Sequence, residues 1–184
     1  MKILPLPLAG AAEIHNSPHR DHRGWFARWF CQDALASIHD GRPIQQINSS
    51  FTAKKGALRG LHLQFAPRME DKIVRCIRGR IHDVIVDLRD ASPTKGRWHS
   101  VVLDADQQNM LYVPKGFAHG FQTLEPDCQV LYLHTEFHSP EREGGYRHDS
   151  PALGIEWPLE VTELSERDRN LPVWEPHLPG IDVA

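Results

Sequence analysis

The sequence predicts an all-β fold, a barrel or a sandwich built from many short strands. Apolar runs follow one another closely between residues 58 and 135, and Gly, Pro, Asp or Asn separates each run from the next. Polar and apolar residues alternate within these runs, for example in residues 81–88 (IHDVIVDL), and such alternation is typical of strands. This spacing favours a barrel or a sandwich over alternating strands and helices. Polar groups at alternate positions also indicate that one face of the sheet lines a site.

The first part of the chain is expected to be extended, with one short helix. Residues 1–20 begin with an apolar segment that two prolines interrupt, which predicts an edge strand. Residues 21–24 (DHRG) predict a turn. The aromatic run 25–30 (WFARWF) predicts a strand, because its side chains alternate between two faces. Residues 31–38 predict a short helix.

The central strands carry the polar positions. Residues 44–51 (IQQINSSF) predict a strand on which Gln46, Asn48 and Ser50 share one face. The other predicted strands cover residues 58–64, 72–77, 80–88, 98–103, 110–113, 117–124 and 128–135.

Beyond residue 139, proline, glycine and charged residues predict mostly irregular structure. The spacing Ser165-x-x-Asp168 has the form of a capping box and predicts a short helix that begins near Ser165. Residues 171–184 (LPVWEPHLPGIDVA) are expected to form an extended surface tail. We find no internal repeat and no linker, so we expect one domain over residues 1–184.

Composition and charge exclude several functional classes. The 184 residues, 40% hydrophobic and 24% charged, have the composition of a soluble globular protein. The net charge of −3 gives no general attraction to nucleic acid or to an anionic membrane, so local Arg and Lys side chains must hold any anionic ligand. No apolar run approaches the roughly 18 residues of a membrane span. The three cysteines form no Cys-x-x-Cys motif and are expected to be reduced thiols in a cytoplasmic protein.

Four side chains form a candidate constellation for proton transfer. Histidine titrates near neutral pH, so His62 can serve as a general base. The phenol of Tyr132 can give or take back a proton, and Lys72 can stabilise a developing oxyanion. Asp168 can hold His62 in one tautomer. Each residue taken alone also has a structural explanation, such as a hydrogen-bonded core residue or a solvated charge.

Two arginines are candidates for phosphate binding. Arg23 and Arg59 each lie next to a glycine, and guanidinium groups bind phosphate oxygens in a bidentate manner. The alternative is that they are two unrelated surface arginines.

A metal site is a further alternative. Residues 114–121 (PKGFAHGF) resemble the second motif of cupin barrels, in which a histidine such as His119 can bind metal. The first cupin motif needs a closely spaced His-x-His followed by Glu, but Gln64 stands here at the second histidine position. Metal sites need three or four suitably spaced ligands. We therefore expect no metal, and a metal-dependent cupin dioxygenase stays an alternative.

The whole set of motifs closely resembles the dTDP-4-dehydrorhamnose 3,5-epimerase family, the nucleotide-sugar epimerases of the cupin superfamily. The resemblance runs in order over about residues 3–172, and several motifs are six or more residues long, so it is highly specific. The matching motifs are Asp21-x-Arg23-Gly24, Gln46-x-Asn48-x-Ser50, Leu58-Arg59-Gly60-Leu61-His62-x-Gln64, Lys72, Gly79-x-Ile81-x-Asp83-Val84, Val86-Asp87-x-Arg89, Ser92-Pro93-Thr94-x-Gly96-x-Trp98, Pro114-x-Gly116-Phe117-Ala118-His119-Gly120-Phe121, Tyr132, Pro140-x-x-Glu143-x-Gly145, Trp157-Pro158 and Ser165-x-x-Asp168.

The resemblance implies a cupin-type jelly-roll β-barrel with a few short peripheral helices. It implies a homodimer in which the edge strand of one subunit joins the partner's sheet. It implies that His62 is the base, partnered by Asp168. Tyr132 would be the acid on the opposite side of the sugar, and Lys72 would polarise the C4 carbonyl. The candidate substrate-binding residues are Arg23, Gln46, Asn48, Arg59, Gln64, His119 and Glu143.

The chain also departs from the family pattern. Arg28 stands where the family usually has a glutamate, and Phe137-His138-Ser139 stands where a pair of tyrosines is usual. His148 takes a position that is often tryptophan. In the family, the glutamate and the second tyrosine help to form the base pocket. We therefore treat Phe26, Arg28 and His138 as candidate specificity residues.

The resulting hypothesis is an isomerase that needs no cofactor and inverts C3 and C5 of a nucleotide-linked 4-keto-6-deoxyhexose. The conversion of dTDP-4-dehydro-6-deoxyglucose to dTDP-4-dehydrorhamnose, in deoxysugar and polysaccharide biosynthesis, is the reference reaction. One alternative is an epimerase of a single carbon, or of a sugar on a different nucleotide. Another is a non-catalytic cupin that binds a nucleotide sugar.

Overall fold

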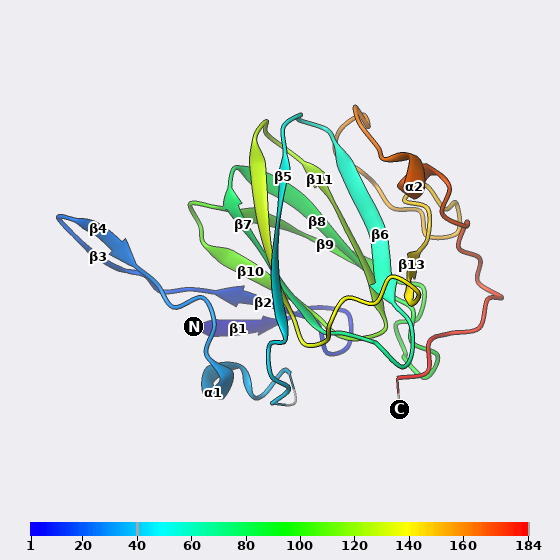
Figure 1. Ribbon diagram of the computed structural model, residues 1–184, viewed down its shortest axis with the longest axis horizontal. Coiled ribbons are helices and arrows are strands. Elements are labelled where there is room, and N and C mark those ends of the chain that lie inside the picture. The colour runs from blue at the N-terminus through cyan, green and yellow to red at the C-terminus, as the bar shows by residue number, and fades with distance from the viewer. Residues whose placement is uncertain (40, 184) are drawn as a thin grey trace.

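The computed structural model describes residues 1–39 and 41–183, and its main strands form two facing β-sheets (Figure 1). The six-stranded sheet has the order β1 (Lys2–Pro5), β2 (Ala12–His15), β10 (Asn109–Val113), β7 (Lys72–Arg78), β12 (Cys128–His134) and β5 (Gln46–Thr52). The five-stranded sheet has the order β13 (Glu143–Gly145), β6 (Leu58–Gln64), β11 (Phe117–Thr123), β8 (Arg80–Asp87) and β9 (Trp98–Asp104). Neighbouring strands in both sheets are antiparallel. The predicted all-β jelly-roll fold is confirmed.

Three smaller elements lie outside the two sheets. A hairpin of β3 (His19–Asp21) and β4 (Gly24–Phe26) projects away from the rest of the chain (Figure 1). The helices α1 (Gln32–Leu35) and α2 (Glu166–Arg169) are single turns at the periphery. Neither helix of the described residues has the length or apolar character to cross a membrane.

The main hydrophobic core lies between the sheets. Val74 and Leu111 of the six-stranded sheet belong to the same buried cluster as Ile85, Phe117 and Phe121 of the five-stranded sheet. Burial of apolar surface at this interface is the chief stabilising contribution to the sandwich.

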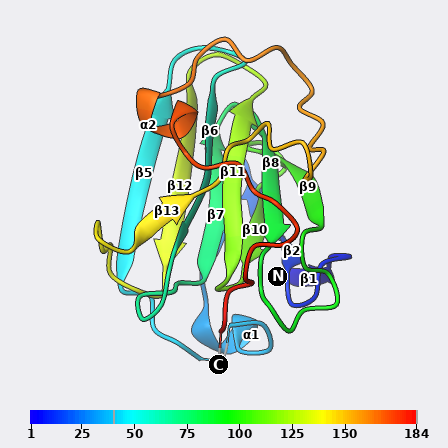
Figure 2. The same cartoon turned by 90° about the vertical axis from the view of Figure 1, so that its right-hand side faces the viewer.

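The outer face of each sheet is covered as well. Leu35 of α1 packs with Ile14 and Met110 on the six-stranded sheet. Trp174 packs with Val86 on the five-stranded sheet, and Figure 2 shows the C-terminal segment (red) crossing that face. Because both faces of the central strands are covered, β11 is buried at every position.

The strand predictions for the middle of the chain are confirmed. Every strand predicted between residues 44 and 135 is present, and the bounds differ by at most two residues. The predicted turn at residues 21–24 joins β3 to β4. The helix predicted near Ser165 is α2, and the Ser165 hydroxyl accepts the backbone N–H of Asp168 at 3.0 Å.

Other local predictions are wrong. The aromatic run 25–30 does not continue as a strand, because β4 ends at Phe26. Trp29 and Phe30 instead pack against the outer cluster of the six-stranded sheet, and the Arg75 guanidinium lies 4.3 Å from the centre of the Trp29 ring. Because Trp29 and Phe30 pack there, the chain leaves the hairpin after Phe26. The helix predicted over residues 31–38 is only the single turn α1, and the short strand β13 was not predicted.

Candidate active site

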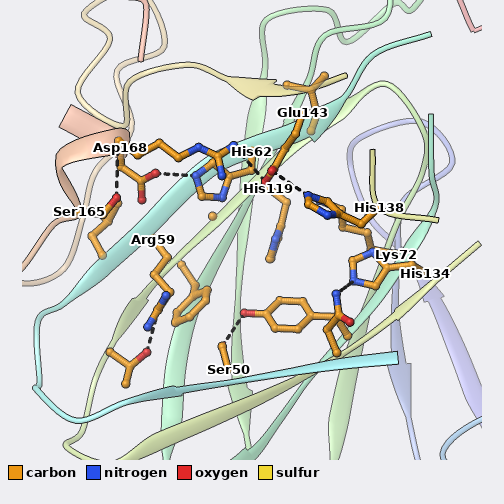
Figure 3. A pocket seen from close by; sticks show the side chains of 18 of the residues that line it. Ser50, Arg59, His62, Lys72, His119, His134, His138, Glu143, Ser165 and Asp168 are labelled. Carbon is orange, nitrogen blue, oxygen red and sulfur yellow. Dashed lines mark hydrogen bonds and ion pairs between the residues drawn. The ribbon is translucent and has the colours of Figure 1, made fainter. Parts of the chain in front are cut away.

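A pocket of about 880 Å³ opens between the two sheets (Figure 3). Strands β5, β7 and β12 form one wall, β6 and β11 form the other, and β13 and α2 contribute to the rim. Gln46, Asn48 and Ser50 all line it, so the face that these residues were predicted to share is the pocket face. Polar side chains at these positions keep the sandwich from closing into a dry core, and the volume lies within the range of about 300–1,000 Å³ that is typical of small-molecule sites.

His62 and Asp168 form a close polar pair in the pocket. His62 lies in the middle of β6, and its Nε2 is 2.6 Å from Oδ1 of Asp168. The second carboxylate oxygen of Asp168 accepts the backbone N–H of Gly60 at 3.2 Å. The cap that Ser165 provides places Asp168 in the single turn of α2 beside β6. Both the position and the orientation of the carboxylate are therefore fixed by the backbone.

This contact determines which nitrogen of His62 is basic. Burial alone would raise the pKa of Asp168, but hydrogen bonds from His62 and Gly60 and the attraction of the imidazole outweigh burial and hold that pKa below its ordinary value. The carboxylate stays ionised and can only accept, so Nε2 of His62 carries the proton. Nδ1 keeps its lone pair, and this tautomer suits a general base.

Tyr132 lies on the opposite wall, on β12. Its hydroxyl is 2.9 Å from the Ser50 hydroxyl. Burial raises the pKa of Tyr132 well above its ordinary value, and the hydrogen bond to Ser50 opposes this shift only in part. The phenol therefore stays protonated at neutral pH and is available as a proton donor.

Lys72, at the start of β7, forms a buried ionic contact. Its Nζ is 3.1 Å from Oε1 of Glu70, and the other carboxylate oxygen of Glu70 is 2.7 Å from Nδ1 of His134. Burial alone would raise the pKa of Glu70, but the charge of Lys72 and the hydrogen bond with His134 hold that pKa below its ordinary value. An ammonium group fixed in this way can present its remaining N–H bonds to a developing oxyanion.

His119 and Gln64 are held by neighbouring groups. Nε2 of His119 is 2.6 Å from Oδ1 of the buried Asp83. The Gln64 amide donates to the Arg68 carbonyl at 2.8 Å and accepts the Ser139 backbone N–H at 2.7 Å, so it ties two loops together. Within residues 1–39 and 41–183, no group of three or more His, Cys, Asp or Glu side chains is placed to hold a metal ion.

Arg59 joins the two walls at one end of the pocket. The arginine lies on β6, and its guanidinium donates to the Thr52 hydroxyl at 3.0 Å and to the Phe51 carbonyl at 3.1 Å. At the other end of β5, the side-chain amide of Gln46 donates to Oδ1 of Asn48 at 3.1 Å.

The rim carries a three-residue ionic cluster. The two carboxylate oxygens of Glu143 lie 3.0 Å from His138 Nε2 and 3.0 Å from the guanidinium of Arg167. Burial alone would raise the pKa of Glu143, but hydrogen bonds from His138 and Arg167 hold that pKa below its ordinary value. Arg167 thus supplies positive charge at the mouth of the pocket, and His138 supplies a polar ring beside it.

Three candidate residues lie outside the pocket of their own chain. Arg23 is at the tip of the β3–β4 hairpin and pairs with Asp21 at 2.7 Å. Phe26, at the end of β4, is 72% exposed, and Arg28, which is also exposed, follows it in the connection to α1. The other candidates, namely His62, Lys72, Tyr132, Asp168, Gln46, Asn48, Arg59, Gln64, His119, His138 and Glu143, all line the pocket.

The pocket lining also includes residues that were not predicted as site residues, among them Glu70, His134 and Arg167. Each of these three is one or two positions from a predicted residue. His134 shares the inward face of its strand with Tyr132, a signal already present in the alternation of residues 128–135. Nothing in the sequence indicated that Glu70 would bridge Lys72 and His134, because this contact depends on the pairing of β7 with β12.

Comparisons with known proteins identify the family of this chain. The family model for dTDP-4-dehydrorhamnose 3,5-epimerase matches residues 5–175. The dTDP-4-dehydrorhamnose 3,5-epimerase of Sinorhizobium fredii is 42% identical over 173 residues, which cover 94% of this chain and 89% of that protein.

Solved structures give the same result. The crystal structure of the Bacillus anthracis dTDP-4-dehydrorhamnose 3,5-epimerase, with TDP and PPi bound, superposes with a TM-score of 0.91 at 36% identity and covers 94% of this chain and 99% of its own. A 3′-monoepimerase of Streptomyces bikiniensis, in complex with dTDP-quinovose, superposes with a TM-score of 0.85 at 36% identity and covers 92% of this chain and 86% of its own. The predicted isomerase class is confirmed. The chain belongs to the dTDP-4-dehydrorhamnose 3,5-epimerase family.

Proposed function

We propose that this protein epimerises C3 and C5 of dTDP-4-dehydro-6-deoxyglucose, with His62 as base and Tyr132 as acid. The observation that carries the proposal is their placement on opposite walls of one pocket, on β6 and β12. A stereocentre inverts when a proton leaves one face of a carbon and another arrives at the opposite face. Two groups that face each other across the substrate meet this requirement.

The reaction proceeds by proton transfers that balance. Nδ1 of His62 takes the proton from a carbon next to the C4 ketone, and the electron pair moves to the carbonyl oxygen as an enolate. The ammonium of Lys72 stabilises this oxyanion. Tyr132 then protonates the opposite face of the carbon, and exchange with water restores both side chains. The net reaction is an isomerisation without any redox change.

Known magnitudes make this set of residues sufficient for substantial catalysis. A positioned acid or base contributes about 10²–10⁴-fold to the rate. One donor to an oxyanion contributes about 3–4 kcal/mol. The hydrogen bond between His62 and Asp168 contributes further to the rate, because it keeps His62 in the tautomer whose lone pair faces the pocket.

The remaining pocket residues suit the anionic part of a nucleotide sugar. Arg59 and Arg167 supply guanidinium groups, which bind phosphate oxygens well. We assign the diphosphate to the part of the pocket between Arg59 and Arg167. Gln46, Asn48, His119 and Glu143 supply hydrogen bonds to the rest of the ligand.

We further propose a homodimer in which the β3–β4 hairpin serves a second copy. The hairpin projects from its own chain and exposes Trp25 at 48% and Phe26 at 72%, and β5, an edge strand, exposes Ile47 and Phe51. Arg23 lies on the same hairpin, so docking on the partner would bring this candidate residue to a pocket. Sedimentation should therefore give the mass of a dimer, and a monomer that turns over substrate would contradict this part.

A single-carbon epimerase is the second candidate. The 3′-monoepimerase of Streptomyces bikiniensis is as identical to this chain as the Bacillus anthracis 3,5-epimerase, at 36%. Arg28 and His138 also leave open a nucleotide other than dTDP.

The free cysteines fit a cytoplasmic location, where nucleotide sugars would be available to the enzyme.

The test is incorporation of deuterium from D₂O into dTDP-4-dehydro-6-deoxyglucose, measured by mass spectrometry and proton NMR. Two deuterons, at C3 and C5, are expected. One deuteron would identify the single-carbon alternative and its carbon. Competition with CDP, GDP and UDP tests the base: much tighter binding of dTDP is expected, and tighter binding of another nucleotide would overturn the choice of dTDP.

A further inference from the structure

We propose that His134 is a positioning residue for this reaction, one that holds Lys72 and Tyr132 in place on their shared wall of the pocket. This inference rests on the proposed function for its catalytic readout. His134 lies on β12, two residues after Tyr132 and directly opposite Lys72 on β7. It therefore stands between the group that would stabilise the enolate and the group that would protonate it.

The direction of the hydrogen bonds around His134 follows from one backbone donor. The backbone N–H of His138 can only donate, and it lies 3.1 Å from Oε1 of Gln46. The amide nitrogen of Gln46 must then be the atom that lies 3.1 Å from Asn48, and it donates to Oδ1. Nδ2 of Asn48 is consequently the atom that faces His134, at 3.5 Å from Nε2.

This series of hydrogen bonds assigns the tautomer of His134. Because Asn48 donates, Nε2 of His134 accepts and carries no proton. Nδ1 carries the proton and donates it to Glu70 at 2.7 Å. The ring is neutral, and its tautomer is opposite to that of His62, in which Nε2 carries the proton.

The neutral ring orders the carboxylate that holds Lys72. Glu70 accepts from His134 through one oxygen and from Lys72, at 3.1 Å, through the other. The three side chains are 8–11% exposed, so little water competes for these bonds. Without His134, the Glu70 carboxylate would be free to rotate, and the direction of the Lys72 N–H bonds would no longer be fixed.

The same ring also supports the proposed acid. The rings of His134 and Tyr132 stack with their centres 6.0 Å apart and an interplanar angle of 27°. The hydroxyl end of Tyr132 is held separately by Ser50. Tyr132 is therefore fixed at its tip by a hydrogen bond and along its face by the imidazole.

The test compares two substitutions in the otherwise intact protein. His134→Gln keeps a donor for Glu70 and an acceptor for Asn48, whereas His134→Leu keeps neither. His82→Leu is the matched control, because His82 is a half-buried strand histidine that packs edge-on against Trp157 outside the pocket. Deuterium incorporation and turnover are measured for each variant, with kcat and KM determined separately.

We expect His134→Leu to lower kcat about tenfold or more, a part of the 10²–10³-fold that removal of an oxyanion donor costs. KM should change less than kcat, because His134 acts on the reacting groups and not on the nucleotide. His134→Gln should recover most of the lost kcat, and His82→Leu should leave kcat unchanged. Equal losses for Gln and Leu, or no loss for Leu, would overturn the proposal.

A spectroscopic readout separates this inference from the proposed function. ¹⁵N NMR of the wild-type protein with labelled histidine should give a protonated Nδ1 and an unprotonated Nε2 for His134. The opposite tautomer, or a doubly protonated ring at neutral pH, would refute the network even if the enzyme is active. If the wild type incorporates no deuterium at all, the proposed function fails, while the NMR result still decides the network. The NMR measurement on the wild-type protein also tests the hydrogen-bond network if His134→Leu does not fold.

Discussion

Replacing Asp168 by Asn tests the geometry of the base most sharply. The two carboxylate oxygens of Asp168 face two groups, Nε2 of His62 at 2.6 Å and the backbone N–H of Gly60 at 3.2 Å. An asparagine has only one oxygen, and the Gly60 N–H can only donate. The amide oxygen therefore turns toward Gly60, and the NH₂ group turns toward His62. Nε2 of His62 must then accept, so the proton moves to Nδ1, the nitrogen that should take the substrate proton.

The expected loss follows from these contacts. To restore the active tautomer in the variant, the proton of His62 must return to Nε2. That N–H would then face the NH₂ group of the asparagine, and a buried donor without an acceptor costs about 1–3 kcal/mol. The imidazolium formed in the reaction also loses its bond to a carboxylate, and such charged bonds contribute about 1.5–3 kcal/mol. The sum of about 2.5–6 kcal/mol corresponds to a loss of about 10²–10⁴-fold in kcat, at 1.36 kcal/mol for each factor of ten.

The assay measures turnover of dTDP-4-dehydro-6-deoxyglucose together with the ¹⁵N shifts of His62. Asp168→Asn should lower kcat with little change in KM and should move the proton of His62 to Nδ1. Asp149→Asn serves as the control, because Asp149 pairs with Arg147 at the surface. A kcat within about threefold of the wild type, against the 10²–10⁴-fold expected for a general base, would refute the assigned tautomer.

Three further predictions concern Lys72 and the stability of the fold. Lys72→Met should lower kcat about 10²–10³-fold, since it removes the donor to the oxyanion; an unchanged kcat would exclude this role. Gly60→Ala should lower the free energy of unfolding by about 1–3 kcal/mol in a denaturant titration, because Gly60 has φ +118° and an added Cβ would lie 2.5 Å from Gly120 Cα; an unchanged midpoint would contradict this close approach. The folded-state pKa of Asp168 is below its ordinary value of 3.8, so its stabilising contribution is complete above that pH and is lost as the pH falls further. Stability should therefore drop below about pH 4, and Asp168→Asn should show a smaller drop.

Much of the fold follows from local patterns in the sequence. Strands such as β6 and β11 were predicted almost to the residue because apolar alternation and glycine boundaries are local signals. The aromatic run 25–30 was mispredicted because its outcome depends on distant partners, namely the outer face of the six-stranded sheet and Arg75. The strand β13 has only three residues, of which two are glycine, and exists only because it pairs with β6.

The same distinction applies to the site. Residue types and motif spacing indicated His62, Tyr132, Lys72 and Asp168, and the fold brings all four to one pocket. The bridge through Glu70 was not predictable, because β7 and β12 must pair before Glu70 can reach His134, which lies 64 positions away in the sequence. Long-range pairing of this kind leaves no local trace in the sequence.

The most direct test of the two-wall mechanism is deuterium exchange by Tyr132→Phe. Without the phenol, His62 can still remove a proton and return a deuteron from D₂O to the same face of the carbon. The variant should therefore incorporate deuterium at C3 and C5 without inverting either centre, whereas the wild type should incorporate deuterium and invert both. If Tyr132→Phe epimerises as fast as the wild type, or if His62→Ala still exchanges at the wild-type rate, the assignment of base and acid to opposite walls is wrong.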